Sequence, residues 1–149
     1  LPAARTLTWS ESEDFETLRG DDQVQAQHGN GAVIAWDLEQ GGISLAAYAV
    51  IAGGAVTETG TTPNVVKTYQ KNVYDQRPYF RIDGQAINDN GGDTKVTIHK
   101  CKATGDIGGE FAEGGFNVTK ASGEGNPDAS GDLYDVVQSE TAANIVQPT

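Results

Sequence analysis

The chain has few of the residue types that most often carry chemistry. Its 149 residues include one cysteine, two histidines and no methionine. The lone Cys101 excludes an internal disulfide and has no CxxC partner, so we expect it to act as a small, buried apolar residue. His28 and His99 are far apart and lack the HxxxH or HxH spacing of metal-binding pairs. We therefore expect no bound metal and no cofactor.

Catalytic motifs are missing as well. The sequence contains neither a GxSxG nucleophile turn nor a GxxxxGK[ST] phosphate loop. The glycine-rich residues 105–109 precede an expected strand, whereas a phosphate cradle precedes a helix. The acidic run over residues 11–16 has no apolar surroundings that would raise the pKa of one carboxyl for acid–base work. We expect that the protein is not an enzyme.

Basic residues are scarce. Ten lysines and arginines stand against 21 aspartates and glutamates, a net charge of −11. Such a balance argues against a nucleic-acid binder and against docking on an anionic membrane. No segment approaches the ~20 apolar residues of a membrane helix, so we expect no membrane partner.

The few basic residues are also unevenly placed. Residues 64–102 carry seven basic and four acidic residues, whereas residues 1–63 carry two and nine, and residues 103–149 carry one and eight. Oppositely charged regions of one chain are able to meet across a repeated contact. Chance clustering on a solvated surface is the alternative.

Most of the remaining sequence alternates with period two, which predicts strands. Such runs occur around Leu7 and Trp9, over Val24–His28 and over Ala32–Leu38, with Gly29-Asn30-Gly31 suited to a hairpin turn between the last two. Further strands are expected at Val56–Gly60, Val65–Tyr69, Pro78–Ile87, Asp93–Lys102, Glu110–Lys120 and Leu133–Glu140. In Asp93–Lys102 we expect Val96 and Ile98 on one face and Thr97, His99 and Cys101 on the other. A bulge is expected at Gly114-Gly115, and a loop over Ala121–Gly131.

One segment, Ile43–Gly54, is apolar on all sides and rich in alanine. Ser44 is suited to cap the first turn, Ile43 and Tyr48 have the spacing of a hydrophobic staple, and Gly53 or Gly54 is suited to end the helix. The sequence therefore predicts one short buried α-helix in a single mainly β domain spanning residues 1–149, with the fold of a β-sandwich or bent barrel. The first residue is Leu1, so we expect that the chain lacks its original N-terminus.

The stretch Ile87–Lys95 combines Asn, Asp and Gly, as calcium loops and tight turns both do. An EF-hand register fails from either Asn88 or Asp89, and no glutamate closes the loop. Two alternating runs flank the stretch, so it is interpreted as a hairpin turn.

The order of several short motifs resembles that of a known family. They are Leu18-Arg19-Gly20-Asp21-Asp22, Gly41–Leu45, Val56–Gly60, Pro78–Gln85, His99–Lys102, Gly109–Phe116 and Leu133–Val136. Together they resemble the major tail (tail tube) protein of long, non-contractile-tailed phages, especially those that infect actinobacteria.

This resemblance implies a β-sandwich or barrel flanked by a helix. It implies a structural subunit of the virion tail, assembled in the host cytoplasm, in which rings of six copies stack helically into a tube that conducts DNA from capsid to host through an acidic lumen. It also implies tape-measure and tail terminator proteins as partners. We expect lumen-facing acids among Asp83, Glu110 and Glu113, and arms that reach neighbours at Ser10–Asp22, Gln70–Gln76 and Ala121–Gly131.

Two other functions stay open at this point. One is a carbohydrate-binding or adhesive β-sandwich module, which would need an exposed aromatic platform. The sequence instead favours core positions for several aromatic residues, namely Trp9, Trp36, Phe80, Phe111 and Phe116. The other is a capsid decoration protein.

Overall fold

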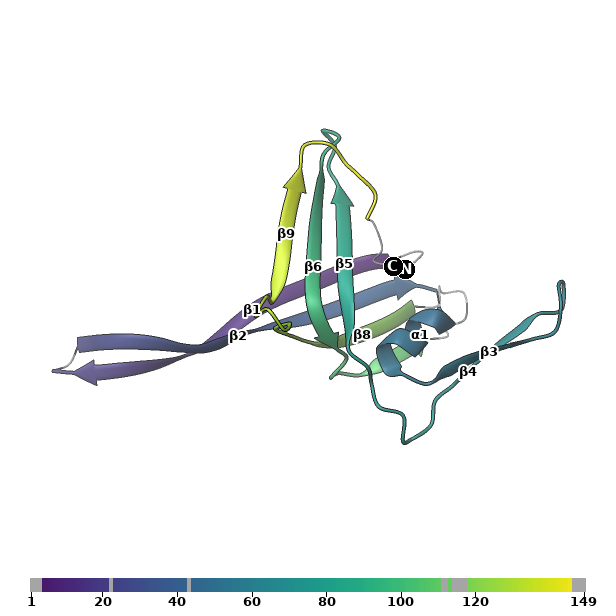
Figure 1. Ribbon diagram of the computed structural model, residues 1–149, viewed down its shortest axis with the longest axis horizontal. Coiled ribbons are helices and arrows are strands. Elements are labelled where there is room, and N and C mark those ends of the chain that lie inside the picture. The colour runs from purple at the N-terminus through teal and green to yellow at the C-terminus, as the bar shows by residue number, and fades with distance from the viewer. Residues whose placement is uncertain (1–3, 22, 43, 111–112, 114–117, 146–149) are drawn as a thin grey trace.

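The structure is a computed structural model that describes residues 4–21, 23–42, 44–110, 113 and 118–145. It is mainly β, with a curled half-barrel sheet and one short helix, which confirms the expected fold class (Figure 1). The elements in chain order are β1 (Ala4–Gly20), β2 (Gln23–Gly41), α1 (Leu45–Ala52), β3 (Ala55–Thr59), β4 (Val66–Gln70), β5 (Phe80–Ile87), β6 (Asp93–Lys102), β7 (Ile107–Glu110), β8 (Val118–Asn126) and β9 (Tyr134–Ser139).

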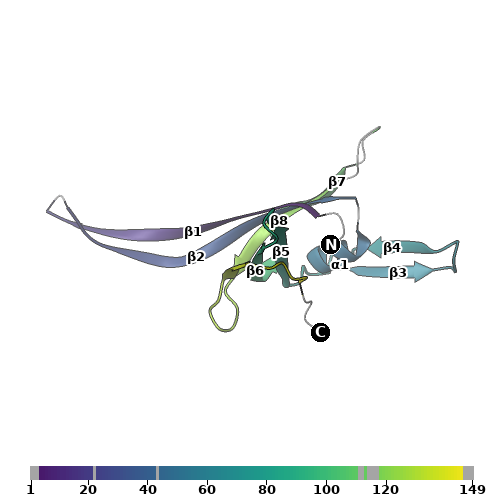
Figure 2. The ribbon, with the colours of Figure 1, turned by 90° about the horizontal axis from the view of Figure 1, so that it is seen from above.

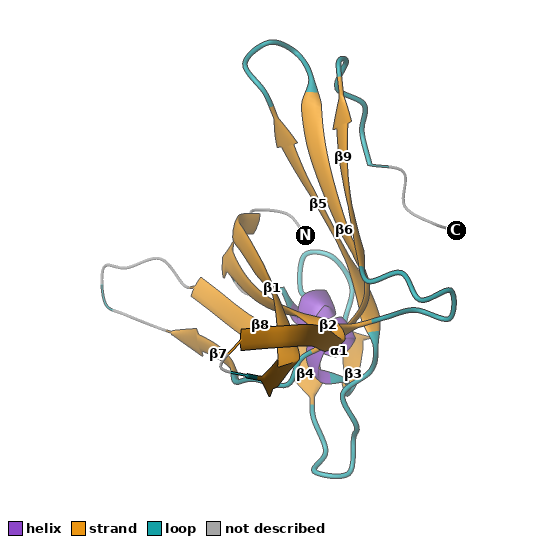
Figure 3. Cartoon of the chain, turned by 90° about the vertical axis from the view of Figure 1, so that its left-hand side faces the viewer, coloured by secondary structure: helices purple, strands orange, loops and turns teal. Residues whose placement is uncertain are grey.

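The main sheet has seven strands, in the order β1-β2-β8-β6-β5, with β7 paired to β8 and β9 paired to β6. One side of β8 pairs with β2, and its other side is shared between β7 over Val118–Ala121 and β6 over Glu124–Asn126. The sheet bends where β8 changes neighbours. Figure 3 shows β5, β6 and β9 turning away from the plane of β2, β8 and β7, with α1 in the angle between the two parts.

Strands β1 and β2 form a long antiparallel ribbon. Only Ile34–Gly41 of β2 also pairs with β8, so the outer half of the ribbon projects beyond the body of the molecule (Figure 1). The expected hairpin turn at Gly29-Asn30-Gly31 was therefore wrong, and Ser10–Asp22 is chiefly strand rather than a flexible arm. The chain reverses next to Asp21, whose φ is 50°.

The residues expected to form that turn make a bulge instead. Glu13 pairs with Ala32 and Phe15 with Gly29, so β2 has one residue more than β1 between these pairs. Gly31 has a φ of 99°, which suits glycine. Asn-Gly with positive φ serves a bulge as well as a turn, and the local sequence does not distinguish the two.

The expected loop over Ala121–Gly131 was also wrong, because β8 continues to Asn126 in the middle of the sheet. Glycine is required at two positions of β8 because neighbouring side chains pack against the strand there. A Cβ on Gly123 would lie 2.7 Å from Cζ2 of Trp36, and one on Gly125 would lie 2.5 Å from Cγ2 of Ile34. A glycine-rich stretch is typical of a loop, but here glycine is what lets large core side chains lie against the strand.

A single strand over Glu110–Lys120 was wrong as well. Strand β7 ends at Glu110, which pairs with Val118, so the chain reverses between them. The expected bulge at Gly114-Gly115 lies outside the described residues.

The β5–β6 hairpin confirms the turn interpretation of Ile87–Lys95. The backbone N–H of Asn88 donates to the carbonyl of Gly92 at 2.8 Å, and that of Gly91 donates to the carbonyl of Asn88 at 3.0 Å. Ile87 pairs with Asp93, so the strands meet directly at the turn. The strands expected at Val56–Gly60, Val65–Tyr69 and Leu133–Glu140 match β3, β4 and β9 within a few residues.

Cys101 was placed on the wrong face of β6 but has the expected character. Phe80 pairs with Cys101 and Ile82 with Ile98, so β6 has an extra residue there and Cys101 turns to the buried side. The side chain is fully buried, and this burial raises the pKa of its thiol to about 12. The thiol is therefore unreactive at neutral pH.

Helix α1 begins and ends as expected. The Oγ of Ser44 accepts a hydrogen bond from the N–H of Ala47 at 3.3 Å, and Gly53 caps the C-terminus with a φ of 75°. Ile43, the expected staple residue, lies outside the described residues. The buried residues Ala47, Ile51 and Ala52 lie on the sheet side of the helix. The β3–β4 hairpin projects from the body on the side opposite to the β1–β2 ribbon (Figure 2).

The core fills the angle of the bent sheet. Its buried apolar residues are Ile34, Trp36, Ala47, Ile51, Ile82, Val96, Ile98, Cys101, Ala103 and Ala121. Trp36 packs edge-to-face on Phe80 with ring centroids 5.5 Å apart. The core position expected for Trp9 was wrong, since it is 39% exposed on the open edge strand β1, while Phe111 and Phe116 lie outside the described residues.

Candidate functional site

The side of the β1–β2–β8–β7 sheet that faces away from the core is a continuous polar surface, called here the outer face. Strand register defines it, because Thr8 pairs with Asp37 and Asp37 pairs with Ser122, and directly paired residues share a face. Its members are Thr6, Thr8, Ser10, Ala35, Asp37, Glu39, Gly108, Glu110, Lys120, Ser122 and Glu124. Each is exposed except Glu39 and Ser122, which are half-buried.

The outer face and the core are the two sides of the same strands, whose successive side chains point alternately outward and inward. Trp36, Leu38 and Ala121 point into the core, and the residues between them point outward. The inward positions are chiefly apolar or glycine, with the buried polar residues Gln40 and Thr119 at one end, and the outward positions are hydroxyl-bearing, charged or small. This division is typical of an antiparallel sheet with one wet face.

The electrostatic character of the outer face is acidic. Four carboxylates, those of Asp37, Glu39, Glu110 and Glu124, share it with one lysine. The Nζ of Lys120 lies 3.8 Å from Oε2 of Glu39, and both side chains keep access to water. An exposed pair of this kind is worth at most about 1 kcal/mol. The four carboxylates outnumber the single lysine, so the net charge of the face repels phosphate groups.

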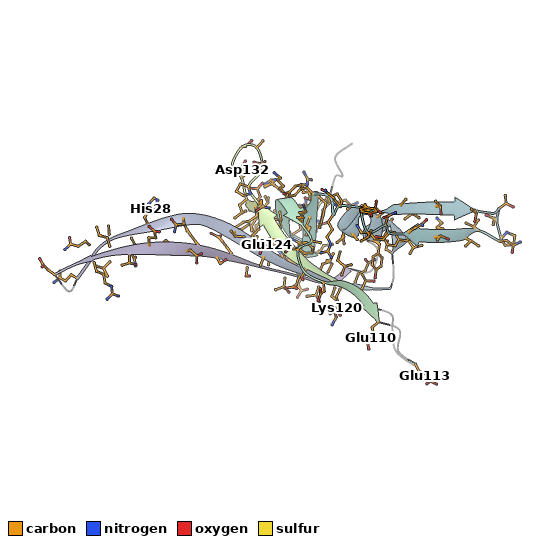
Figure 4. The ribbon with its side chains drawn as sticks, turned by 90° about the horizontal axis from the view of Figure 1, so that it is seen from below. His28, Glu110, Glu113, Lys120, Glu124 and Asp132 are labelled. Carbon is orange, nitrogen blue, oxygen red and sulfur yellow. The ribbon has the colours of Figure 1, made fainter. Side chains whose placement is uncertain are left out.

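The three candidate lumen-facing acids do not all lie on one surface. Glu110 ends β7 on the outer face, and Figure 4 shows Glu113 beyond it on the same side of the molecule. Asp83 lies on β5, in the part of the sheet that turns away. Its carboxylate accepts hydrogen bonds from Nε of Arg81 and from Oγ1 of Thr97, both at 2.9 Å.

Sequence reasoning missed most of the outer face. Asp37 and Glu124 were not proposed, although each alternates with buried residues of its own strand. For Glu124 a signal was present, because Ser122 and Glu124 alternate with Ala121, Gly123 and Gly125. This alternation was missed because the glycines were interpreted as loop residues.

A second polar cluster surrounds the fully buried Asp93. Its Oδ2 accepts from Nε2 of Gln85 at 2.6 Å and from the N–H of Ala143 at 3.2 Å, and it lies 3.2 Å from Nζ of Lys95. Burial raises the pKa of this carboxyl, but the hydrogen bonds from Ala143, Gln85 and their neighbours outweigh burial, so the pKa is lower than usual. The cluster fastens the segment after β9 to the β5–β6 hairpin.

Replacing Asp93 by asparagine is expected to release this segment. The amide oxygen would still accept from Gln85 and Ala143, but the charge facing Lys95 would be lost, and the amide nitrogen would take the buried place of Oδ1, which has no hydrogen-bond partner among the described residues. Hydrogen exchange at the amide of Ala143 should speed up by roughly tenfold or more. Because the folded pKa lies below the unfolded value of 3.8, the wild-type stabilisation holds above that pH and is lost as pH falls further. Asp93→Asn should lack this acid dependence.

The matched control is Asp89→Asn, in the exposed turn of the same hairpin. Equal exchange rates at Ala143 in wild type and Asp93→Asn would contradict the assigned role.

Ligands for a metal do not cluster in the part of the chain that the structure describes: no three His, Cys, Asp or Glu side chains come together. His99 instead lies 3.1 Å from Oδ2 of Asp135 on the neighbouring strand β9. Among the same residues, no helix is long and apolar enough to cross a membrane.

Comparison with protein-family models gave no match for this chain, and comparison with curated proteins gave none either.

Proposed function

We propose that this chain is the structural subunit of a phage tail tube, in which rings of six copies stack around a channel that conducts DNA. The observation that carries the proposal is the β1–β2 ribbon, whose outer half extends away from the body and is covered by no other element (Figure 1). The resemblance of the short sequence motifs to tail tube proteins points to the same class.

The outer half of the ribbon, residues 12–20 and 23–33, is called here the outer ribbon, and its exposed side chains support a contact between chains. It exposes apolar side chains on both of its faces, with Phe15 60%, Leu18 66% and Val24 54% exposed. A two-stranded ribbon alone is at best marginally stable in water, and an open strand edge invites pairing with another chain. A neighbouring copy in an assembly would stabilise the ribbon and cover its open strand edge.

The outer face supplies the second requirement of a DNA channel. Its carboxylates repel the phosphate backbone, and a channel must let DNA slide without holding it. We assign Asp37, Glu110 and Glu124 to the wall of the channel.

A carbohydrate-binding module is less well supported. Such a module needs aromatic rings gathered on one surface. Among the described residues, the most exposed aromatic side chains are Phe15, on the β1–β2 ribbon, and Tyr74 and Tyr79, both in the connection between β4 and β5.

Electron microscopy of the purified chain tests the proposal. We expect rings or tubes with six-fold symmetry. The matched variant replaces residues 13–32 by Asn-Gly, which makes a two-residue hairpin between Ser12 and Val33. This variant keeps the core and the outer face, so it should unfold at a similar temperature yet stay monomeric. A wild-type chain that stays monomeric at high concentration would sink the proposal.

A further inference from the structure

Two lysines and a tyrosine form a basic patch near the end of β6. The Nζ atoms of Lys100 and Lys102 lie 4.8 and 4.9 Å from the ring centroid of Tyr79, which is 54% exposed. Both ammonium groups are therefore held over one aromatic ring.

Neither lysine of the patch forms an ion pair with an acidic residue in the described part of the chain. Other bases of this region are paired, as Arg81 is with Asp83 and Lys95 with Asp93. Glu124 stands opposite Lys102 in the strand register, but no described carboxylate forms an ion pair with either lysine of the patch. Lys100 and Lys102 are two residues apart on one strand, so their side chains point the same way about 7 Å apart.

The outer ribbon presents a matching pair of carboxylates. Asp14 and Glu16 are also two residues apart on one strand, with the same spacing of about 7 Å. Both are exposed, and neither has a hydrogen bond or ion pair to the described residues. Leu18 follows on the same face and is 66% exposed, which adds apolar area to the charged pair.

The ribbon does not reach the patch of its own chain. Figure 1 shows its tip far from β6, with the two strands crossing once as the ribbon twists. Glu16 pairs with His28, and Figure 4 shows His28 on the opposite side of the molecule from Lys120 and Glu110. The twist thus turns the Asp14–Glu16 face away from the outer face.

We propose that Tyr79, Lys100 and Lys102 bind the outer ribbon of a second copy of this chain through Asp14 and Glu16. The contact is head-to-tail, since each copy offers one ribbon and one patch, and contacts of this kind build rings or filaments. The inference rests on the proposed function and deepens it by naming the surfaces that join the subunits.

Charge exchange tests the contact. The variants Lys100→Glu/Lys102→Glu and Asp14→Lys/Glu16→Lys should each lower the self-association constant by about 100-fold. The quadruple variant that carries both changes should recover the self-association constant to within about tenfold of the wild-type value, because opposite charges again face each other. Sedimentation velocity at several salt concentrations measures the constant, and circular dichroism checks the fold of each variant. Asp89→Lys/Asp132→Lys is the control for Asp14→Lys/Glu16→Lys, with the same charge change at exposed positions elsewhere.

The outcomes separate this contact from the proposed function. Tubes that form normally in both double variants would overturn the contact and leave the tube proposal standing. In another outcome, the quadruple variant restores salt-sensitive oligomers, but no rings or tubes form. This result would support the contact and contradict the tube proposal. Loss of association in both double variants without rescue would also overturn the assigned pairing. The neutral variant Lys100→Gln/Lys102→Gln covers the case in which the glutamates disturb folding.

Discussion

Replacing Trp36 by alanine is expected to lower the free energy of unfolding by about 3–5 kcal/mol, the usual cost of truncating a buried tryptophan. Trp36 is 1% exposed and lies at the centre of the core, against Phe80 and above Gly123. The core is small, so the cavity would remove contacts that few other side chains replace. Since domains are stable by only about 5–15 kcal/mol, Trp36→Ala should be partly unfolded near room temperature.

Two further variants test whether the loss comes from the buried aromatic ring of Trp36. Trp36→Phe should cost less, because it keeps an aromatic ring and removes an indole N–H that has no hydrogen-bond partner among the described residues. Trp9→Ala removes the same side chain from the directly paired position of β1, where it is 39% exposed, and should cost less than Trp36→Ala. Urea denaturation followed by circular dichroism gives the three values. Equal losses for Trp9→Ala and Trp36→Ala would contradict this description of the core.

The elements that could be predicted from the sequence are those with local signals. Helix α1 has a serine cap, an apolar body and a glycine stop, and these local signals set where it begins and ends. The β5–β6 hairpin has strong alternation on both sides of Asn-Asp-Asn-Gly-Gly, and the turn chemistry fixes where the chain reverses.

The elements that could not be predicted depend on distant partners. In β8, the glycines at 123 and 125 are explained by residues of the two neighbouring strands: Trp36 and Ile34 on β2, and Lys102 and Ile98 on β6. In the ribbon, residues 10–20 are mostly polar and resemble a loop because no core covers them, although β2 pairs with them over nearly their whole length. A strand whose faces are both wet carries no apolar alternation.

The same limit applies to the candidate site. Alternation places Glu110 on one face of a strand, but only the pairing of β7 with β8 shows that this face continues to Asp37 and Glu124. Asp83 alternates just as clearly, yet it lies beyond the bend of the sheet and is bound to Arg81 and Thr97. The alternation of residues along one strand shows which of them share a face. It does not show which faces of different strands form one surface.

Reversing the charge of the outer face is expected to turn a surface that repels DNA into one that binds it. The variant Asp37→Lys/Glu110→Lys/Glu124→Lys replaces three exposed acids that lie on three strands of one face. We expect rings or tubes as in the wild type, because the changed residues are outside the core and outside the outer half of the ribbon. Wild-type assemblies should bind short duplex DNA weakly at physiological salt. The variant should bind it, with an affinity that falls roughly 40-fold between about 50 and 200 mM salt if about three phosphates are contacted per chain. Fluorescence anisotropy of labelled DNA measures both.

The matched control is Asp89→Lys/Asp132→Lys/Glu140→Lys, which changes the net charge equally at exposed positions off the outer face. Figure 4 shows Asp132 on the side of the molecule opposite to Lys120 and Glu110. If the outer face lines a closed channel, the control assembly should gain DNA affinity only on its outside, and short duplexes should stay accessible to nuclease. DNA bound by the outer-face variant should be protected, because the wall of the tube encloses it. Equal affinity and equal nuclease sensitivity in the two variants would show that the outer face does not line the channel.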